Sequence, residues 1–293
     1  MRVLTLRTQR DTHPDPHADA HANRDTDSDT DRYANRNAHA RSGLLMNPIL
    51  NVLLLSLLAG LGTGLGGLIA IVRKPGEKSF GFLMGFAAGV MITLSFLELV
   101  AEAWQLSGYL VATIGFAVGA FLMLVIDVLT PHIRFGEEEK DSLDHKLLKT
   151  GMLVAIGISI HNIPEGIAVG AGYMHMPEFG LFIALAIALH NVPEGIATAL
   201  PLCRGGVCRW DSFRIAFLSG LVEPLGALLA ALFLTSFQDL IPAALAFAGG
   251  VMVFLTLDEL VPTAREHGHQ HFTAIGIILG AIFIFLLSGI LGV

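Results

Sequence analysis

From residue 48 to its end, the chain alternates long apolar stretches with short polar connections. Eight stretches reach about 20 residues, the length of helix that crosses the hydrocarbon core of a bilayer. Hydrocarbon offers no partner to a backbone amide, and the apolar runs are continuous rather than alternating, so they predict helices and not a barrel. The predicted spans are residues 48–72, 80–104, 108–130, 151–173, 179–202, 212–236, 241–263 and 272–292.

The composition agrees with residence in a membrane. Hydrophobic residues make up 53% of the 293 positions, charged residues make up 15%, and the mean hydropathy is +0.65. Soluble domains carry roughly 25% charged residues, so the composition argues against a soluble globular protein. We therefore expect an all-α polytopic membrane protein with eight transmembrane helices, in the plasma membrane or a cell inner membrane.

The basic residues predict which side of the membrane each connection faces. Beyond residue 47 they occur only in or beside the first, third, fifth and seventh connections. They are Arg73, Lys74, Lys78, Arg134, Lys140, Lys146, Lys149, Arg204, Arg209, Arg214 and Arg265. Because positively charged connections stay in the cytoplasm, these four connections are predicted to be cytoplasmic. With eight spans, both termini then lie outside.

Residues 1–47 form a polar tail that differs from the transmembrane domain of residues 48–293. The tail is repetitive (DTDSDTDRYANRNAHAR) and offers almost nothing apolar to bury, so we expect it to be disordered. It lacks the apolar segment of a signal peptide. Met46 stands directly before the first span and is an alternative start of translation, a hypothesis that peptides from residues 1–45 of the native protein would contradict.

The second and seventh spans resemble each other. GFAAGVMITLSFLELV (Gly85 to Val100) and AFAGGVMVFLTLDELV (Ala246 to Val261) are 161 residues apart and are identical at nine of 16 positions. Two spans that are five apart cross the membrane in opposite directions, which predicts an inverted repeat of the kind found in transporters. The alternative is a chance likeness between two glycine-rich apolar helices. With the fourth and fifth spans as a central pair, the repeat predicts a 3+2+3 arrangement.

A polar motif occurs twice inside the apolar region, as HNIPEG at His161–Gly166 and HNVPEG at His190–Gly195. In each copy the histidine and the glutamate are one helical turn apart and share a face. Should the copies meet, one pocket would hold two imidazoles, two carboxylates and two amide oxygens. That mixture suits divalent first-row metals such as Zn²⁺, Fe²⁺ and Mn²⁺, whereas Ca²⁺ and Mg²⁺ prefer oxygen alone. A lone histidine at this depth would equally suit an interhelical hydrogen bond.

Buried carboxylates favour a functional role for these residues. A charged side chain at the bilayer centre costs roughly 2.5–3.5 kcal/mol on insertion scales. Glu165 and Glu194 of the two motifs carry this cost, and Glu223, which precedes a proline in GLVEPLG, is a candidate further ligand. Auxiliary candidates along an ion path, each with solvation or a helix contact as its alternative, are Glu98, Asp127, Glu259, His267, His269 and His271.

With these motifs, the chain resembles the ZIP (Zrt- and Irt-like) divalent metal transporters, and most closely their bacterial ZupT- and GufA-like branch. The resemblance covers residues 48–293 and rests on HNIPEG, HNVPEG, EPLG and LVIDVLTPH. It implies eight helices in a 3+2+3 inverted repeat, both termini outside, and a binuclear metal site between the fourth, fifth and sixth helices. It also implies alternating access by one helix bundle that slides against another.

The resemblance assigns ligands to two metal positions with bridging glutamates. The first position would use His161, Glu165, His190 and Glu194. The second would use Asn162, Glu165, Asn191, Glu194 and Glu223. Cys203 and Cys208 match no strong zinc pattern, and we expect free thiols.

The predicted function is uptake of a divalent transition metal into the cytoplasm, with Zn²⁺ first and Fe²⁺, Mn²⁺, Co²⁺ and Cd²⁺ as further candidates. The expected partners are these ions and the lipid bilayer, with no catalytic cofactor and no nucleic acid. No GxxxxGK[ST] motif occurs, so no nucleotide is expected as the direct energy source. The sequence leaves the oligomeric state open, and a homodimer is one alternative.

Two other functions remain as alternatives. A membrane-embedded zinc hydrolase would hold a catalytic metal with one open position for water. Against it stand the absence of HExxH and the duplication of the motif, because a hydrolase needs only one activated water. A structural helix bundle that uses metal as a staple would leave the inverted repeat unexplained.

Overall fold

The computed structural model describes residues 47–129, 143–204 and 206–293, without the side chains of 143–158, 204 and 267. The predicted tail therefore lies outside the described residues, apart from Asn47. Within the described ranges the regular elements are all helical and no strand occurs. They are α2 (Pro48–Arg73), α3 (Glu77–Thr93), η1 (Leu94–Val100), α4 (Ala101–Leu129), α5 (Leu143–His175), α6 (Pro177–Arg204), α7 (Arg209–Gly220), α8 (Glu223–Ser236), η2 (Gln238–Leu240), α9 (Ile241–Leu255), η3 (Thr256–Leu260), α10 (Val261–His267) and α11 (Gln270–Leu291).

Six helical stretches in the described residues are long and apolar enough to cross a membrane. They are Pro48–Arg73, Glu77–Leu129, Pro177–Cys203, Arg209–Ser236, Gln238–Glu266 and Gln270–Leu291. An all-α polytopic membrane protein is thereby confirmed.

The predicted count of eight spans differs from these six stretches at two places. Predicted spans 80–104 and 108–130 fall within one stretch of 53 residues, whose backbone leaves the helical conformation at Gly108 (φ 77°, ψ 171°). Predicted span 151–173 lies in α5, of which the side chains are described only from residue 159. The count of eight therefore stays a prediction.

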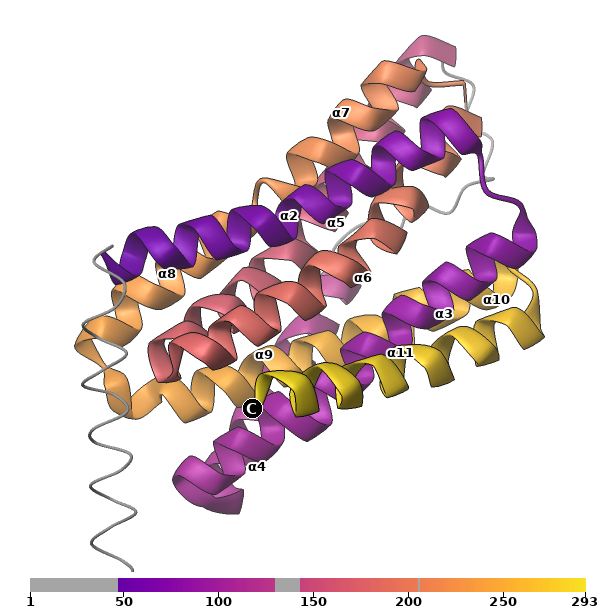
Figure 1. Cartoon of the computed structure of the whole chain (residues 1–293). Helices are drawn as coiled ribbons and strands as arrows, with labels where there is room; N and C mark the ends of the chain where they lie inside the picture. The colour runs from indigo at the N-terminus through magenta and orange to yellow at the C-terminus, as the bar shows by residue number, and fades with distance from the viewer. Residues whose placement is uncertain (1–46, 130–142, 205) are drawn as a thin grey trace, which may run out of the picture. The chain divides into compact units, whose positions relative to one another are not determined.

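The helices from Pro48 onward pack in two groups. In the first helix group, α2 lies along α6, α7 and α8, and α5 lies along α8 (Figure 1). In the second helix group, α3 lies along α11 and α4 lies along α9 (Figure 1). The two groups meet where α5 contacts α9 and where α6 contacts α3.

Glycines allow the closest contacts of the second helix group. A Cβ atom on Gly89 of α3 would collide with the carbonyl of Ile277 on α11, and one on Gly250 of α9 would collide with the carbonyl of Phe116 on α4. Gly89 and Gly250 are corresponding positions of the sequence repeat. The two copies of the repeat thus use the same glycine to approach a neighbouring helix, as small residues commonly do in membrane helices.

The repeat copies also share an interruption of their helices. A π-helical segment follows α3 at Leu94–Val100, and another follows α9 at Thr256–Leu260. With the offset of 161 residues, the second segment corresponds to positions 95–99. Such π-bulges often mark functional positions, and each of these contains the repeated glutamate, Glu98 or Glu259.

An apolar cluster joins the helix ends that flank three of the basic connections. It brings Ala70 at the end of α2 against Phe80 at the start of α3, Leu200 near the end of α6, Ala216 of α7 and Ala264 of α10. These ends therefore lie together. Far from this cluster, Asn51 at the start of α2 donates a hydrogen bond of 2.8 Å to the hydroxyl of Tyr173 near the end of α5.

Candidate metal centre

The two HN-PEG motifs lie within α5 and α6, which contact each other in the first helix group. A proline stands inside each helix, Pro164 in α5 and Pro193 in α6. Each proline removes one main-chain hydrogen-bond donor from its helix. The glycine that ends each motif allows close packing, because a Cβ atom on Gly166 would meet the carbonyl of Glu223 and one on Gly195 would meet the carbonyl of Thr63.

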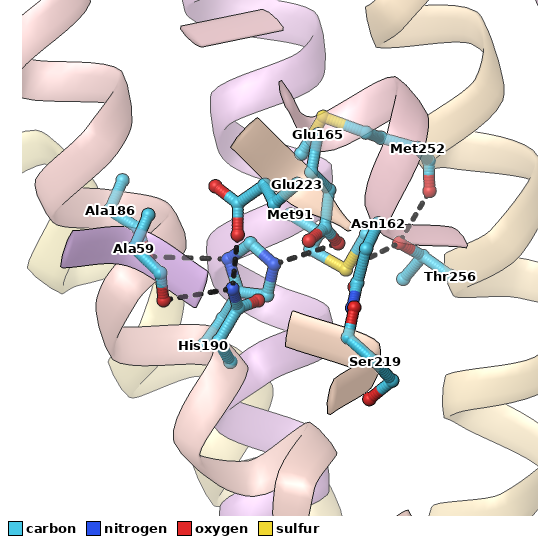
Figure 2. A network of polar contacts seen from close by, with 11 residues as sticks. Ala59, Met91, Asn162, Glu165, Ala186, His190, Ser219, Glu223, Met252 and Thr256 are labelled. Atoms are coloured by element: carbon cyan, nitrogen blue, oxygen red, sulfur yellow. Dashed lines mark hydrogen bonds and ion pairs between the residues drawn. The ribbon is translucent and has the colours of Figure 1, made fainter. Parts of the chain in front are cut away.

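Three predicted ligands come together between these helices. The ligand atoms of Glu165, His190 and Glu194 all lie within 4.8 Å of one another. His190 and Glu165 are almost completely buried, and His190 Nε2 lies 3.1 Å from Glu165 Oε1. Figure 2 shows the imidazole of His190 between the carbonyl of Ala186 and this carboxylate.

The contacts of His190 require a proton or a metal ion between the imidazole and Glu165. His190 Nδ1 lies 3.3 Å from the carbonyl oxygen of Ala186, an acceptor toward which this nitrogen must present its proton. In a neutral imidazole, Nε2 then carries a lone pair toward the carboxylate of Glu165. Two acceptors 3.1 Å apart repel each other unless a proton or a metal ion lies between them. Zinc bonds of about 2.0–2.2 Å to nitrogen and to oxygen suit that separation.

The two asparagines are oriented by hydrogen bonds from their amide nitrogens. Asn191 Nδ2 donates to the carbonyl of Ala59 at 3.1 Å and to Glu223 Oε2 at 3.0 Å. Asn162 Nδ2 donates to the carbonyl of Ser219 at 2.7 Å. With their NH₂ groups engaged in this way, both amides are left with an oxygen that can serve as a metal ligand.

Buried oxygens without hydrogen-bond partners gather on the predicted ligands. Seven buried side-chain polar atoms of the described residues lack a partner, and five of them belong to this set. The five are Asn162 Oδ1, Glu165 Oε2, Asn191 Oδ1, Glu194 Oε1 and Glu223 Oε1. Buried polar atoms nearly always have hydrogen-bond partners in native proteins. These five oxygens lie together without partners and are chemically suited to coordinate a cation.

Similarity to known proteins identifies the family of this chain. The family model described as "ZIP Zinc transporter" matches residues 131–288. The chain belongs to the ZIP family. It is 40% identical over 234 residues to "Zinc transporter ZupT" of Corynebacterium aurimucosum, an alignment that covers 73% of this chain and 87% of the relative.

Other ZIP relatives are similarly close. "Zinc transporter ZupT" of Streptococcus mutans is 38% identical over 233 residues, which cover 74% of this chain and 88% of that protein. "Zinc transporter ZTP29" of Arabidopsis thaliana is 38% identical over 220 residues, with 69% and 80% coverage. The predicted membership of the ZupT-like branch is confirmed, and these names indicate a transporter rather than the hydrolase alternative.

His161 lies apart from the three-residue cluster of this ZIP protein. Its Nε2 atom is 3.1 Å from Glu259 Oε2, and the two side chains are 18% and 53% exposed. His161 belongs to α5 in the first helix group, whereas Glu259 belongs to η3, next to α9 of the second. Two residues that the sequence placed separately, one in the metal site and one along the ion path, are thus brought into contact.

The other auxiliary candidates whose side chains are described do not join the cluster. Glu98 and Asp127 are half-buried on the stretch that contains α3 and α4. His269 and His271 are exposed, with ring centroids 5.6 Å apart, and the side chain of His267 lies outside the described residues.

Sequence reasoning missed three features around this site. The carbonyls of Ala59 and Ser219 orient the asparagines, and an apolar or small residue gives no signal of such a role. Thr256 donates to the carbonyl of Met252 at 2.7 Å and lies 3.6 Å from Met91 Sδ (Figure 2). Met91 and Met252 are corresponding repeat positions, which was the available signal. Both cysteines are free, as predicted.

The double donation by Asn191 makes a prediction for the metal-free protein. Asn191→Asp replaces the NH₂ group by an oxygen opposite the Ala59 carbonyl and the Glu223 carboxylate. Unsatisfied buried groups cost about 1–3 kcal/mol, so the thermal midpoint in detergent with EDTA should fall by several degrees. The exposed change Gln238→Glu is the control and should have little effect. Equal midpoints for Asn191→Asp and the control would contradict this orientation of the amide.

Proposed function

We propose that this ZIP protein carries divalent transition-metal ions, zinc above all, across the membrane into the cytoplasm. The observation that carries the proposal is the set of five buried oxygens without partners beside His190. A divalent cation would satisfy several of these oxygens at once, and would also separate the two acceptors of His190 and Glu165. The printed names of the relatives, which describe zinc transporters, agree with zinc as cargo.

The proposed ligands form two adjacent metal positions. The first position uses Glu165, His190 and Glu194, whose ligand atoms are already within 4.8 Å. His161 would complete it by leaving Glu259. The second uses Asn162, Asn191 and Glu223, with Glu165 and Glu194 as bridges. Support for this second position comes from the free oxygen on each of its five residues.

The ligand set bears on which metals are carried. One or two imidazoles among carboxylate and amide oxygens suit Zn²⁺, Fe²⁺, Mn²⁺ and Co²⁺, and Cd²⁺ resembles zinc closely enough to compete. Selectivity among them depends on the size and rigidity of the cavity. We therefore propose zinc as the main cargo and the other ions as competitors.

We further propose eight spans in a 3+2+3 inverted repeat, with both termini outside the cytoplasm of a cell inner or plasma membrane. The break at Gly108 divides the 53-residue stretch into two spans, and α5 supplies another. The shared π-helical segments and the paired contacts of Gly89 and Gly250 support the repeat. The apolar cluster at Ala70 and Phe80 supports a common side for the basic connections.

Alternating access would then be a movement between the two helix groups. The first helix group holds the proposed ligands, and its His161 contacts the second group through Glu259. The membrane potential can drive entry, because a doubly charged ion gains about 4.6 kcal/mol per 100 mV when it moves inward. This driving force acts on the ion itself and does not require a nucleotide.

The proposed orientation is tested by labelling the connection between α6 and α7. Cys208 is exposed in this connection, so a membrane-impermeant maleimide should label it only from the cytoplasmic side. Asp239→Cys, between α8 and α9 and in a background without native cysteines, should be labelled only from outside. Labelling of both positions from the same side would contradict the orientation.

The transport proposal is tested by zinc uptake into proteoliposomes with an inside-negative potential. Glu165→Gln removes a bridging charge while it keeps the side-chain shape, and uptake should fall at least about tenfold, as loss of a metal-site partner typically does. Glu178→Gln, an exposed change on the neighbouring helix α6, is the matched control. Competition by Fe²⁺, Mn²⁺, Co²⁺ and Cd²⁺ would rank the metals.

Two results would contradict the proposal. One is equal uptake by the wild type and Glu165→Gln. The other is zinc that binds to the wild type but never crosses the membrane under the imposed potential. This second result would favour the hydrolase alternative.

A further inference from the structure

A second histidine–glutamate pair lies outside the proposed metal centre. His175 Nε2 is 2.8 Å from Glu102 Oε1, and the side chains are 20% and 28% exposed. His175 ends α5 in the first helix group, and Glu102 begins α4 in the second, 73 residues away. The pair therefore bridges the two groups, and no proposed role uses it.

The position of this pair separates it from the proposed metal centre. His175 follows Glu165 by ten residues on α5, a distance of about 15 Å along the axis at 1.5 Å per residue. Tyr173, two residues before His175, contacts Asn51 at the start of α2. The pair thus lies at the helix ends opposite the basic connections, on the side that the proposed orientation makes extracytoplasmic.

Neighbouring side chains hold the pair and extend it inward. The ring of Phe179 packs edge-on against the imidazole of His175, with centroids 5.8 Å apart and an interplanar angle of 88°. Glu98 precedes Glu102 by four residues and interacts with it electrostatically. Glu98, which also forms a hydrogen bond with Ser288 of α11, places a second carboxylate one turn deeper along the same helical stretch.

We propose that His175 and Glu102 form an extracytoplasmic loading site, which takes a divalent metal ion from solution before the ion reaches the central ligands. Zinc bonds of about 2.0–2.2 Å to nitrogen and oxygen span a gap of 2.8 Å at an angle of about 80–90°, and a widening of roughly 0.6 Å would make the angle tetrahedral. The ion can therefore replace the proton of the hydrogen bond with little movement of either helix. Water completes the coordination, since both side chains are partly exposed.

The two-ligand character of this site suits loading rather than storage. An ion held by one imidazole and one carboxylate, with water in the other positions, exchanges more easily than one enclosed by buried ligands. Glu98 offers the next carboxylate on the way inward. This inference rests on the proposed transport function. Loss of the loading site should mainly weaken the apparent affinity of the transporter for external metal.

The test compares zinc uptake by proteoliposomes across a range of external zinc concentrations for the wild type, Glu102→Gln and His175→Gln. Glutamine keeps a hydrogen bond to the remaining partner, so a merely structural contact between the helices would survive. A loading site predicts a KM raised about tenfold, a typical cost of losing a metal-site partner, with an unchanged maximal rate. Glu178→Gln serves again as the control.

An unchanged KM in both variants would overturn the loading site. A lower maximal rate at unchanged KM would also overturn it, because the pair would then act on the conformational change and not on capture.

Equilibrium binding separates this inference from the transport proposal. In detergent, a Glu165→Gln protein should retain one weak zinc site that is lost when His175→Gln is added. That loss supports zinc binding by His175 and Glu102 even if the wild type carries no zinc across the membrane. Equal zinc binding by the Glu165→Gln protein with and without His175→Gln would overturn the loading site. Absent uptake by the wild type, with that binding intact, would instead overturn the transport proposal and leave the zinc site of His175 and Glu102 in place.

Discussion

Polar oxygens are buried here among apolar helices, far from water, and the arrangement of the surrounding helices follows from this burial. Glu165 and Glu223 are almost fully enclosed, and each has one carboxylate oxygen without a partner. Such atoms cost free energy in a medium without water. Their arrangement is therefore understandable if a cation compensates for them. The backbone carbonyls of Ala59 and Ser219 accept hydrogen bonds from the side-chain nitrogens of Asn191 and Asn162. The side-chain oxygens of both asparagines are thereby left available to a cation.

Close helix packing makes this concentration of oxygens achievable. Gly166 allows α5 to lie directly against the start of α8, which brings Glu223 toward the ligands of α5 and α6. The second helix group is built on the same device, with Gly89 and Gly250 at corresponding positions. Contacts between the groups include two histidine–glutamate pairs, both from α5, with His161 four residues before Glu165 and His175 ten residues after it. Helix α5 is thus the element through which an ion site and a movement between groups could be coupled.

The sequence predicted the all-helical membrane class and the ZIP family, both of which are confirmed. The spacing of histidine and glutamate in each motif predicted a shared helical face within that motif, whereas the approach of Glu165, His190 and Glu194 to one another was implied only by the resemblance to ZIP transporters. The contact of His161 with Glu259 could not be predicted, since it joins helices whose relative placement depends on packing across the whole chain. The oxygen of a backbone carbonyl, such as that of Ala59, leaves no trace in residue type.

The span count shows a point where the sequence and the backbone agree. The apolar pattern divided the 53-residue stretch between residues 104 and 108, where Gln105 and Ser107 interrupt it, and the positive φ of Gly108 lies at the same place. Glycine reaches such a conformation without the steric cost that other residues meet. The π-helical segments carry no composition signal, although the repeat indicated that the two would correspond.

The most direct test of the central claim is zinc K-edge X-ray absorption on the purified, zinc-loaded protein. The proposed site predicts a first shell of nitrogen and oxygen at about 2.0–2.2 Å, with an imidazole contribution that decreases in His190→Ala. A sulfur shell near about 2.3 Å would instead place the ion on Cys203 and Cys208. That result, or a spectrum unchanged by His190→Ala, would contradict the claim that zinc satisfies the buried oxygens of the two HN-PEG motifs.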